Sequence, residues 1–325
     1  MTKLIVVLGA TGGQGGSVVT NFLATPGWRV RGLTRNASSD KAASLRARGV
    51  EVVEANTDNQ ASLERAFEGA NAIFAVTNYY DYFFELGPEK SIARETAQGC
   101  NIARAAAKTA SSSSSSGTLE RFVWSTLPNT ELFTQGAAVV PHFQGKANVD
   151  VYIKSQLPEL YAKTTFAVFT IFGVNLFYPA PPETPYPSIG DHRINSGIFV
   201  HAVITTPTPP AAGTYVHCNV EDLTLESYLA ACGRASGLSP EPGSTVVVQV
   251  SMEQYCTLWP GMGEEQASQW RFFGYVNQAG IDLMNVPGFP VVSAQEIMSE
   301  EAKKALVGTE ESLARMDWSA FGEGY

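Results

Sequence analysis

The sequence predicts an α/β protein: a doubly wound parallel sheet with helices on both faces, followed by a smaller α+β lobe. Two observations predict the sheet. Short β-branched runs alternate with amphipathic stretches, and a glycine-rich turn directly follows the first run. A third observation predicts the lobe, because proline-rich segments interrupt the chain after Tyr178. The chain has 325 residues, enough for about two domains. We therefore expect a first domain at residues 1–178 and a second lobe at residues 179–325.

Six runs rich in β-branched and aromatic residues are expected to form the strands of the sheet. They are residues 3–8, 29–34, 50–54, 72–77, 121–125 and 165–171. Helix-like stretches separate them, which is the pattern of parallel strands joined by crossover helices.

The first two helices have clear signals. The first carries apolar residues at helical spacing, namely Val18, Val19, Phe22 and Leu23. The second is expected to begin after the N-cap candidates Ser38 and Ser39 and to end at Gly49.

Two further helices are expected in the first domain, and two in the lobe. The third follows Asp58 and Asn59, and Asp58 is expected to be its N-cap rather than a ligand. The fourth runs from about Pro88, a residue favoured at the first position of a helix, to Ala110. In the second lobe, we expect helices near residues 223–235 and 264–278.

Composition excludes several classes of protein. Lys and Arg number 22 and Asp and Glu 31, a net charge of −9, which argues against direct binding of nucleic acid. The four cysteines form no C-x-x-C pair, and neither cysteine nor histidine shows metal-ligand spacing, so we expect reduced thiols and no metal. The most apolar stretch, residues 166–178, is shorter than the ~18 residues of a membrane span. A cytoplasmic protein is expected, with the nucleus left open.

The strongest functional signal is the run LIVVLGATGGQGGSVV near the N-terminus. Gly9, Gly12 and Gly15 form a G-x-x-G-x-x-G pattern between a strand and a helix, as in a Rossmann-type dinucleotide site. A tight turn there needs glycine, and the helix N-terminus presents free N–H groups to a pyrophosphate. The residues expected to bind the cofactor at this turn are Gly9, Thr11, Gly12, Gly13, Gln14 and Gly15.

The end of the second expected strand indicates which cofactor binds. An NAD site usually places Asp or Glu there, for the ribose 2′-hydroxyl. This chain has Leu33, Thr34, Arg35 and Asn36 instead, with no acid. Arg35 is suited to pair with a 2′-phosphate, so NADP(H) is favoured over NAD(H).

The ends of the third and fourth expected strands add four candidate contacts. Asn56 is placed where a side-chain amide could read the adenine edge, and Thr57 follows it. Thr77 and Asn78, after the fourth run, are expected beside the inner ribose.

The reactive groups are expected on a helix after the fifth strand. His142, Lys146, Val149 and Ile153 are spaced so that they share one otherwise apolar face, which should point inward. A lysine there could bind ribose hydroxyls and act as a proton donor or base. The alternative is a surface lysine paired with Asp150, and a proton-transfer role for His142 is the less favoured possibility.

These segments resemble the NmrA-like family, atypical members of the short-chain dehydrogenase/reductase superfamily. The resemblance rests on GATGGQGG, LTRN, QGCNIARAAAK, RFVWST and PHFQGKANVDVYI. It implies that Asn175, in FGVNLFY, closes over the nicotinamide and that Ser125 lies near the superfamily's catalytic serine position. Where the superfamily has Tyr-x-x-x-Lys, this chain has His142 and Lys146. Some relatives bind NADP(H) without turnover and regulate transcription factors, and others reduce small molecules with the lysine alone.

Two functions therefore remain open. The first is an NADPH-dependent reductase of an apolar or aromatic small molecule, and the second is an NADP(H) sensor that binds a regulatory protein partner. An aromatic run after the fourth strand is expected either to wall a substrate pocket or to pack in the core, and residues of the second lobe would face it. These aromatic residues are Tyr79, Tyr80, Tyr82, Phe83 and Phe84, faced by Phe177, Tyr178 and Tyr186.

Overall fold

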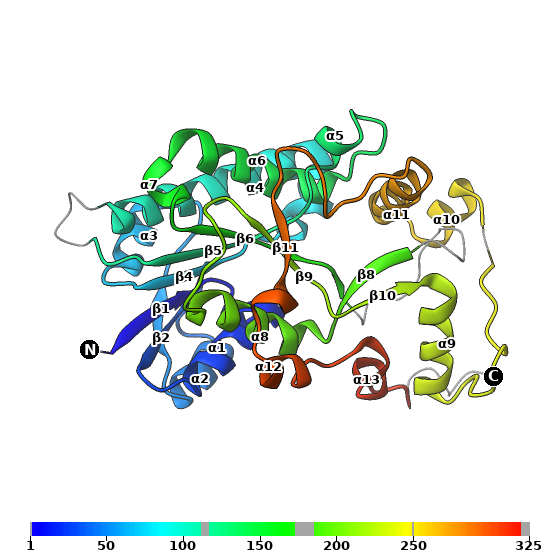
Figure 1. Ribbon diagram of the computed structural model, residues 1–325, viewed down its shortest axis with the longest axis horizontal. Helices are drawn as coiled ribbons and strands as arrows, with labels where there is room; N and C mark the ends of the chain where they lie inside the picture. The colour runs from blue at the N-terminus through cyan, green and yellow to red at the C-terminus, as the bar shows by residue number, and fades with distance from the viewer. Residues whose placement is uncertain (1, 112–116, 173–184, 249, 320–325) are drawn as a thin grey trace.

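The computed structural model describes residues 2–111, 117–172, 185–248 and 250–319. Helices cover both faces of a central parallel sheet, and a second lobe lies at one end of it (Figure 1). The predicted class, a doubly wound α/β sheet with a smaller lobe, is confirmed.

The described residues form an eight-stranded sheet in the order β11-β9-β6-β5-β4-β1-β2-β3, with every neighbouring pair parallel. The strands are β1 (Lys3–Val7), β2 (Trp28–Thr34), β3 (Glu51–Glu54), β4 (Ala72–Ala75), β5 (Arg121–Thr126), β6 (Thr164–Phe169), β9 (Tyr215–Cys218) and β11 (Val291–Ser293). The chain runs outward from β1 to β3, then returns to place β4 on the other side of β1. Ligands of such sheets bind at this reversal, beyond the carboxyl ends of the strands.

Each face of the sheet has its own helices and its own apolar core. One face carries α1 (Gly13–Leu23), α2 (Asp40–Ala47) and α8 (His192–Thr205), and α1 packs against α8. The opposite face carries α3 (Gln60–Phe67), α4 (Tyr80–Ala110), α6 (Pro141–Gln156) and α7 (Pro158–Tyr161). α4 packs against α6, and α6 packs against β5.

The second lobe surrounds a small sheet in the order β10-β8-β7 and has a separate core rich in aromatic residues. Its elements are β7 (Ile171–Phe172), β8 (Pro185–Gly190), β10 (Glu221–Thr224), α9 (Leu225–Ser236), α10 (Met252–Leu258), α11 (Gly263–Gln278) and α13 (Thr309–Ala314). Shorter elements are α5 (Thr130–Phe133), η1 (Ala294–Ile297) and α12 (Glu300–Lys304). The expected boundary at residue 178 lies outside the described residues, and β9 and β11 from the second half join the main sheet.

The structure differs from the sequence-based expectations at α4, at the N-cap of α3 and at the run of residues 165–171. The helix expected from Pro88 to Ala110 forms the second part of α4. A non-helical Gly87 (φ 72°) separates it from an additional helical segment that begins at Tyr80 and was not expected. Asp58 is not the N-cap of α3, because the Asn59 side chain accepts the Ser62 N–H instead. Asp58 pairs with Arg94 at 2.9 Å. The run expected at 165–171 is two strands, β6 and β7, in different sheets.

All four cysteines are free thiols. Within the described part of the chain, every helix is too short or too polar to span a bilayer. Those same residues contain no group of three or more metal-ligating side chains.

Candidate active site

A cleft of about 1190 Å³ opens at the carboxyl ends of β1, β2, β4, β5 and β6, between the main sheet and the second lobe. Most of the residues predicted for the site line it. These are Gly9, Thr11, Gly12, Gly13, Gln14, Gly15, Arg35, Thr57, Thr77, Asn78, Ser125, His142 and Lys146. Asn175, also expected there, lies outside the described residues.

The glycine-rich turn has the backbone that a phosphate cradle needs. Gly9 adopts φ +64°, which a residue with a Cβ rarely does. A Cβ on Gly15 would overlap the Gly9 carbonyl, so the turn can close against α1 only with glycine there. Gly12 caps α1 in extended conformation without any side-chain hydrogen bond to the helix. The first N–H groups of α1 therefore face the cleft, and with the helix dipole they favour an anion.

Arg35 follows β2 at the mouth of this cleft, where a 2′-phosphate was expected. Its Nη1 donates to Asp81 Oδ2 at 2.8 Å, and the other oxygen of Asp81 accepts from Asn78 Nδ2 at 2.6 Å. The Arg35 side chain is 65% exposed. The guanidinium is thus accessible to a ligand, but a carboxylate already occupies part of its donor set.

Asn56 follows the end of β3, as expected, but does not line the main cleft. It lines a smaller hollow of about 320 Å³ that also includes Arg35 and Arg65. Its Oδ1 accepts the Asp58 N–H at 2.9 Å, so this oxygen stabilises the turn before α3. The neighbouring Thr57 lines the main cleft.

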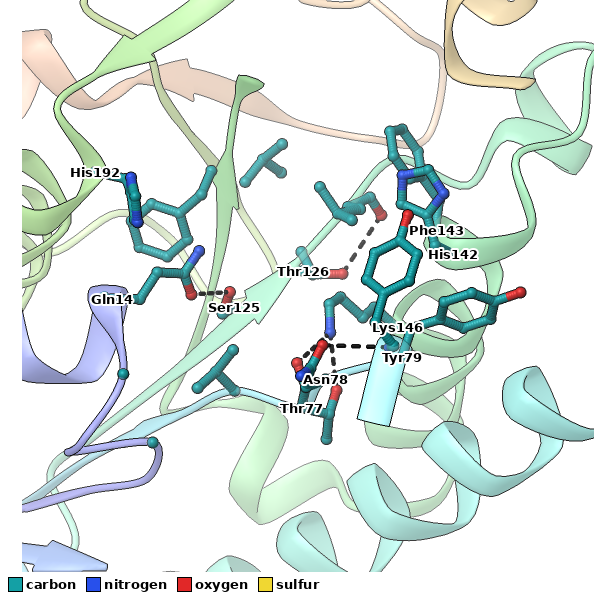
Figure 2. Close-up of a pocket in the computed structure, with 18 of the residues that line it drawn as sticks. Gln14, Thr77, Asn78, Tyr79, Ser125, Thr126, His142, Phe143, Lys146 and His192 are labelled. Carbon is teal, nitrogen blue, oxygen red and sulfur yellow. Dashed lines mark hydrogen bonds between the residues drawn. The ribbon is translucent and has the colours of Figure 1, made fainter. Parts of the chain in front are cut away.

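Lys146 lies on α6 with only 8% of its surface exposed. Its Nζ donates to the carbonyl oxygen of Thr77 at 2.7 Å and to Thr77 Oγ1 at 2.9 Å (Figure 2). It also donates to Glu95 Oε1 at 2.5 Å. The predicted inward orientation is confirmed. The alternative pairing with Asp150 is wrong, because Asp150 accepts from Thr126 Oγ1 and Tyr215 instead.

Glu95, on α4, is the buried counter-ion that sequence reasoning missed. It is 2% exposed, and its Oε1 also accepts from Thr77 Oγ1 at 2.8 Å. A Cβ on Gly145 would overlap the Glu95 carboxylate, which explains a glycine in mid-helix next to Lys146. One feature of the sequence could have indicated Glu95. It is an acidic residue that shares the buried face of α4 with Ser91, one turn before it, and Gly99, one turn after it.

His142 lies one turn before Lys146 and is held by a residue of the second lobe. Its Nδ1 is 2.6 Å from Glu265 Oε1, and its backbone N–H donates to the same oxygen at 3.2 Å. Tyr79 Oη donates to the other oxygen of Glu265 at 3.2 Å. Burial and the nearby Glu265 raise the pKa of Tyr79 well above its usual range, so its phenol stays protonated. Glu265, on α11, carried no sequence signal, because 123 residues separate it from His142.

Two more groups line the opposite side of the cleft, as Figure 2 shows. Ser125 Oγ, at the end of β5, donates to Gln14 Oε1 at 3.1 Å. His192, at the start of α8, lies where a Cβ on Gly13 would be. Burial lowers the pKa of His192 to about 4, so it is neutral at physiological pH.

The aromatic run after β4 divides between the two expected roles. Tyr79 and Tyr80 line the cleft. Phe83 packs behind them, Tyr82 lies under the Arg94 guanidinium, and Phe84 is 74% exposed. From the second lobe, Tyr186 is buried against Trp270 rather than in the cleft, which corrects that expectation. Phe177 and Tyr178 lie outside the described residues.

The wall that the second lobe contributes comes instead from α10 and α11. It is formed by aromatic, apolar and neutral amide side chains, namely Tyr255, Trp259, Met262, Gln266, Gln269 and Phe273. Such a surface suits an apolar or aromatic ligand with hydrogen-bonding groups.

Comparison with known sequences identifies one family. The model of the NmrA-like family matches residues 1–282. An NmrA-like family domain-containing oxidoreductase, cpsB of Aspergillus campestris, is 32% identical over 234 residues, covering 63% of this chain and 64% of the relative. The oxidoreductase himF of Aspergillus japonicus is 33% identical over 151 residues, covering 45% of this chain and 41% of that relative. The chain thus matches less than two thirds of the length of either relative.

Solved structures share the whole architecture. NmrA, a negative transcriptional regulator, in complex with NADP has a TM-score of 0.66 at 19% identity, over 100% of this chain and 99% of that one. The triphenylmethane reductase of Citrobacter sp. complexed with NADP(H) has a TM-score of 0.63 at 17% identity, over 96% of this chain and 98% of that one. At these identities the likeness shows the fold.

Proposed function

The chain belongs to the NmrA-like family, and on that premise we propose that it is an NADPH-dependent reductase of an apolar or aromatic small molecule. The observation that carries the proposal is that one cleft contains a phosphate cradle and two buried groups able to bind or transfer protons, Lys146 and His142. Relatives named as oxidoreductases, and NADP-bound structures of the same fold, support it.

The residues present fit a dinucleotide. The uncapped N-terminus of α1 offers N–H groups to the pyrophosphate, and Arg35 offers its guanidinium to a 2′-phosphate. When bound, the reduced nicotinamide supplies a hydride. Lys146 is assigned the positioning of the inner ribose and of the acceptor, because its Nζ lies at the end of β4 beside Thr77.

The wall formed by α10 and α11 is assigned to the acceptor molecule. It excludes water and offers the side-chain amides of Gln266 and Gln269 without a free charge. Tyr79 and Tyr80 close the same space from the sheet side. The acceptor class that fits is a neutral or weakly charged aromatic compound.

The experiment is NADPH oxidation, followed at 340 nm, with a panel of aldehydes, enones, quinones and cationic dyes. We expect turnover of at least one apolar acceptor, with NADPH preferred to NADH. Tight NADPH binding without turnover on the whole panel would contradict the reductase.

That result would instead support a second function, an NADP(H) sensor that reports to a protein partner. One observation favours it: the three N–H groups of Lys146 already have acceptors in Thr77 and Glu95. A lysine held by three acceptors can contribute to cofactor binding without taking part in a reaction. The NmrA structure is that of a transcriptional regulator, which fits this alternative.

A further inference from the structure

We infer that His142 is the proton donor of the proposed reduction and that Glu265 of the second lobe is the residue that positions it. This inference rests on the proposed function and assigns its second reactant, the proton. It also gives the second lobe a part in the chemistry beyond enclosing the acceptor.

The geometry fixes the ring of His142 in one orientation. A carboxylate can only accept hydrogen bonds, so the 2.6 Å contact places a proton on Nδ1, donated to Glu265 Oε1. The Glu265 carboxylate is itself 5% exposed and fixed by two further donors, the His142 backbone N–H and Tyr79 Oη. Rotation of the ring would therefore break a buried, charge-assisted hydrogen bond.

The other ring nitrogen, Nε2, is the one left for chemistry. Among the described residues it has no hydrogen-bond partner, and it is not one of the fully buried polar atoms. The side chain of His142 is 11% exposed and lines the cleft. A histidine whose Nδ1 is bound to a buried carboxylate, with Nε2 open to a ligand site, has the arrangement of a general acid or base.

Lys146 is the competing donor, and its contacts argue against it. An ammonium has three N–H groups, and here Thr77 O, Thr77 Oγ1 and Glu95 Oε1 accept them. Donating a proton to the acceptor would leave the buried Glu95 carboxylate without its counter-ion, which is costly. Lys146 therefore binds and positions, while His142 remains able to exchange a proton.

The proposed reduction adds one hydride and one proton to the acceptor. The acceptor's C=O or C=N carbon gains a hydride and forms a C–H bond, and the π electron pair moves to the heteroatom. The heteroatom then bonds to the proton that leaves Nε2 of the His142 imidazolium. Neutral His142, with its Nδ1 proton still donated to Glu265, takes up a proton on Nε2 from solution at the cleft mouth, so the reduction consumes one proton from solution overall. The groups around the ring that titrate or carry charge are Glu265 from α11, Tyr79 and Tyr80 from the start of α4, and Lys146 on its own helix.

This assignment makes a prediction that depends on the charge of the acceptor. A neutral aldehyde needs both hydride and proton. A triarylmethane cation such as malachite green needs the hydride alone, because hydride transfer already gives a neutral product. Loss of His142 Nε2 should therefore slow the first reaction more than the second.

The test uses two variants and one matched control. His142→Asn keeps a donor toward Glu265 but lacks Nε2, and Glu265→Gln removes the charge and keeps the shape. Glu264→Gln makes the same chemical change at the exposed neighbouring position and is the control. With 4-nitrobenzaldehyde, we expect kcat to fall about 100-fold or more in His142→Asn and about tenfold or more in Glu265→Gln. With malachite green, each variant should lose less activity than with the aldehyde. The ratio of aldehyde to dye turnover should therefore fall about tenfold or more in His142→Asn, whereas Glu264→Gln should leave both rates and their ratio unchanged.

Two outcomes overturn the inference. Equal losses on both acceptors would mean that the pair only maintains the structure, and unchanged aldehyde turnover in His142→Asn would remove the proton donor. Absence of turnover with every acceptor would instead refute the proposed reductase, and the proton donor with it.

A second readout does not depend on activity. In ¹⁵N-histidine-labelled protein, NMR should show the His142 proton on Nδ1 in wild type and in Glu264→Gln. The Nδ1 signal should change in Glu265→Gln. A proton on Nε2 in the neutral wild-type ring, or no response to Glu265→Gln, would refute the positioning role of Glu265.

Discussion

The buried pair of Lys146 and Glu95 makes removal of either residue alone a poor test of chemistry. The two side chains are 8% and 2% exposed, so deleting one leaves the other charged and without its partner in a dry environment. Breaking such a pair costs about 3–5 kcal/mol, whereas replacing both partners by neutral residues of similar size is close to neutral. Lys146→Met and Glu95→Gln should therefore each destabilise strongly, and the double variant should regain most of that loss.

For a chain of this length, a loss of about 3–5 kcal/mol lowers the midpoint of thermal unfolding by about 4–7 °C. Urea unfolding followed by circular dichroism measures the four proteins of this double-mutant cycle. We expect a coupling free energy of at least about 2 kcal/mol. Additive losses in the double variant, or a loss under about 1 kcal/mol in Lys146→Met, would refute the buried pair.

Three other predictions follow from the same structure. Burial raises the pKa of Asp150 from 3.8 to about 7. Between about pH 4 and pH 7, the folded protein therefore holds a proton on Asp150 that the unfolded chain has released. The free energy of unfolding decreases as pH rises through this range. Urea unfolding of wild type and Asp150→Asn measures this effect. The free energy of unfolding of Asp150→Asn, relative to that of wild type, should rise by about 2–3 kcal/mol from pH 5 to pH 8. A difference between the two proteins that does not change with pH would contradict this. Gly15→Ala should weaken NADPH binding at least about tenfold by fluorescence titration, because its Cβ would overlap the preceding turn. Gly16→Ala, with its nearest contact at 3.5 Å, should bind normally, and equal behaviour of the two would contradict the cradle. Asp81→Asn removes the carboxylate paired with Arg35. It should tighten NADPH binding about two- to fivefold and leave NADH binding unchanged. Weaker NADPH binding would contradict this and show that the Asp81 carboxylate contributes to cofactor binding.

The parts of the site that the sequence predicted are those determined by nearby residues. The glycine turn needs only its own backbone and the helix that follows, so Gly9 and Gly15 were identified from their spacing. The inward orientation of Lys146 and His142 followed from helical periodicity on α6. The parallel sheet followed from the alternation of strand-like and helix-like runs.

The parts that were missed depend on contacts between distant segments. Periodicity places Lys146 on an inner face but cannot say that α4 brings Glu95 against it. In the same way, Glu265 reaches His142 only because the second lobe folds over the main sheet. The choice between Asp58 and Asn59 as N-cap failed for a different reason, since both are good caps and a single-residue offset decides between them.

The pairing of Arg35 with Asp81 shows how a correct expectation about position can miss a contact. Sequence placed the guanidinium after β2, at the mouth of the cleft, where it lies. It gave no sign that an additional helical segment, which begins at Tyr80 before the break at Gly87, would bring a carboxylate to it.

We propose that this cleft holds a dinucleotide with a 2′-phosphate and that Arg35 binds this phosphate. The most direct measurement is titration of wild type and Arg35→Ser with NADPH and NADH at fixed, moderate ionic strength. A charge-assisted hydrogen bond contributes about 1.5–3 kcal/mol, so wild type should bind NADPH roughly 10- to 100-fold more tightly than NADH. Arg35→Ser should lose this preference and keep the same affinity for NADH. Equal affinity of wild type for the two cofactors, or a preference that survives in Arg35→Ser, would contradict the account.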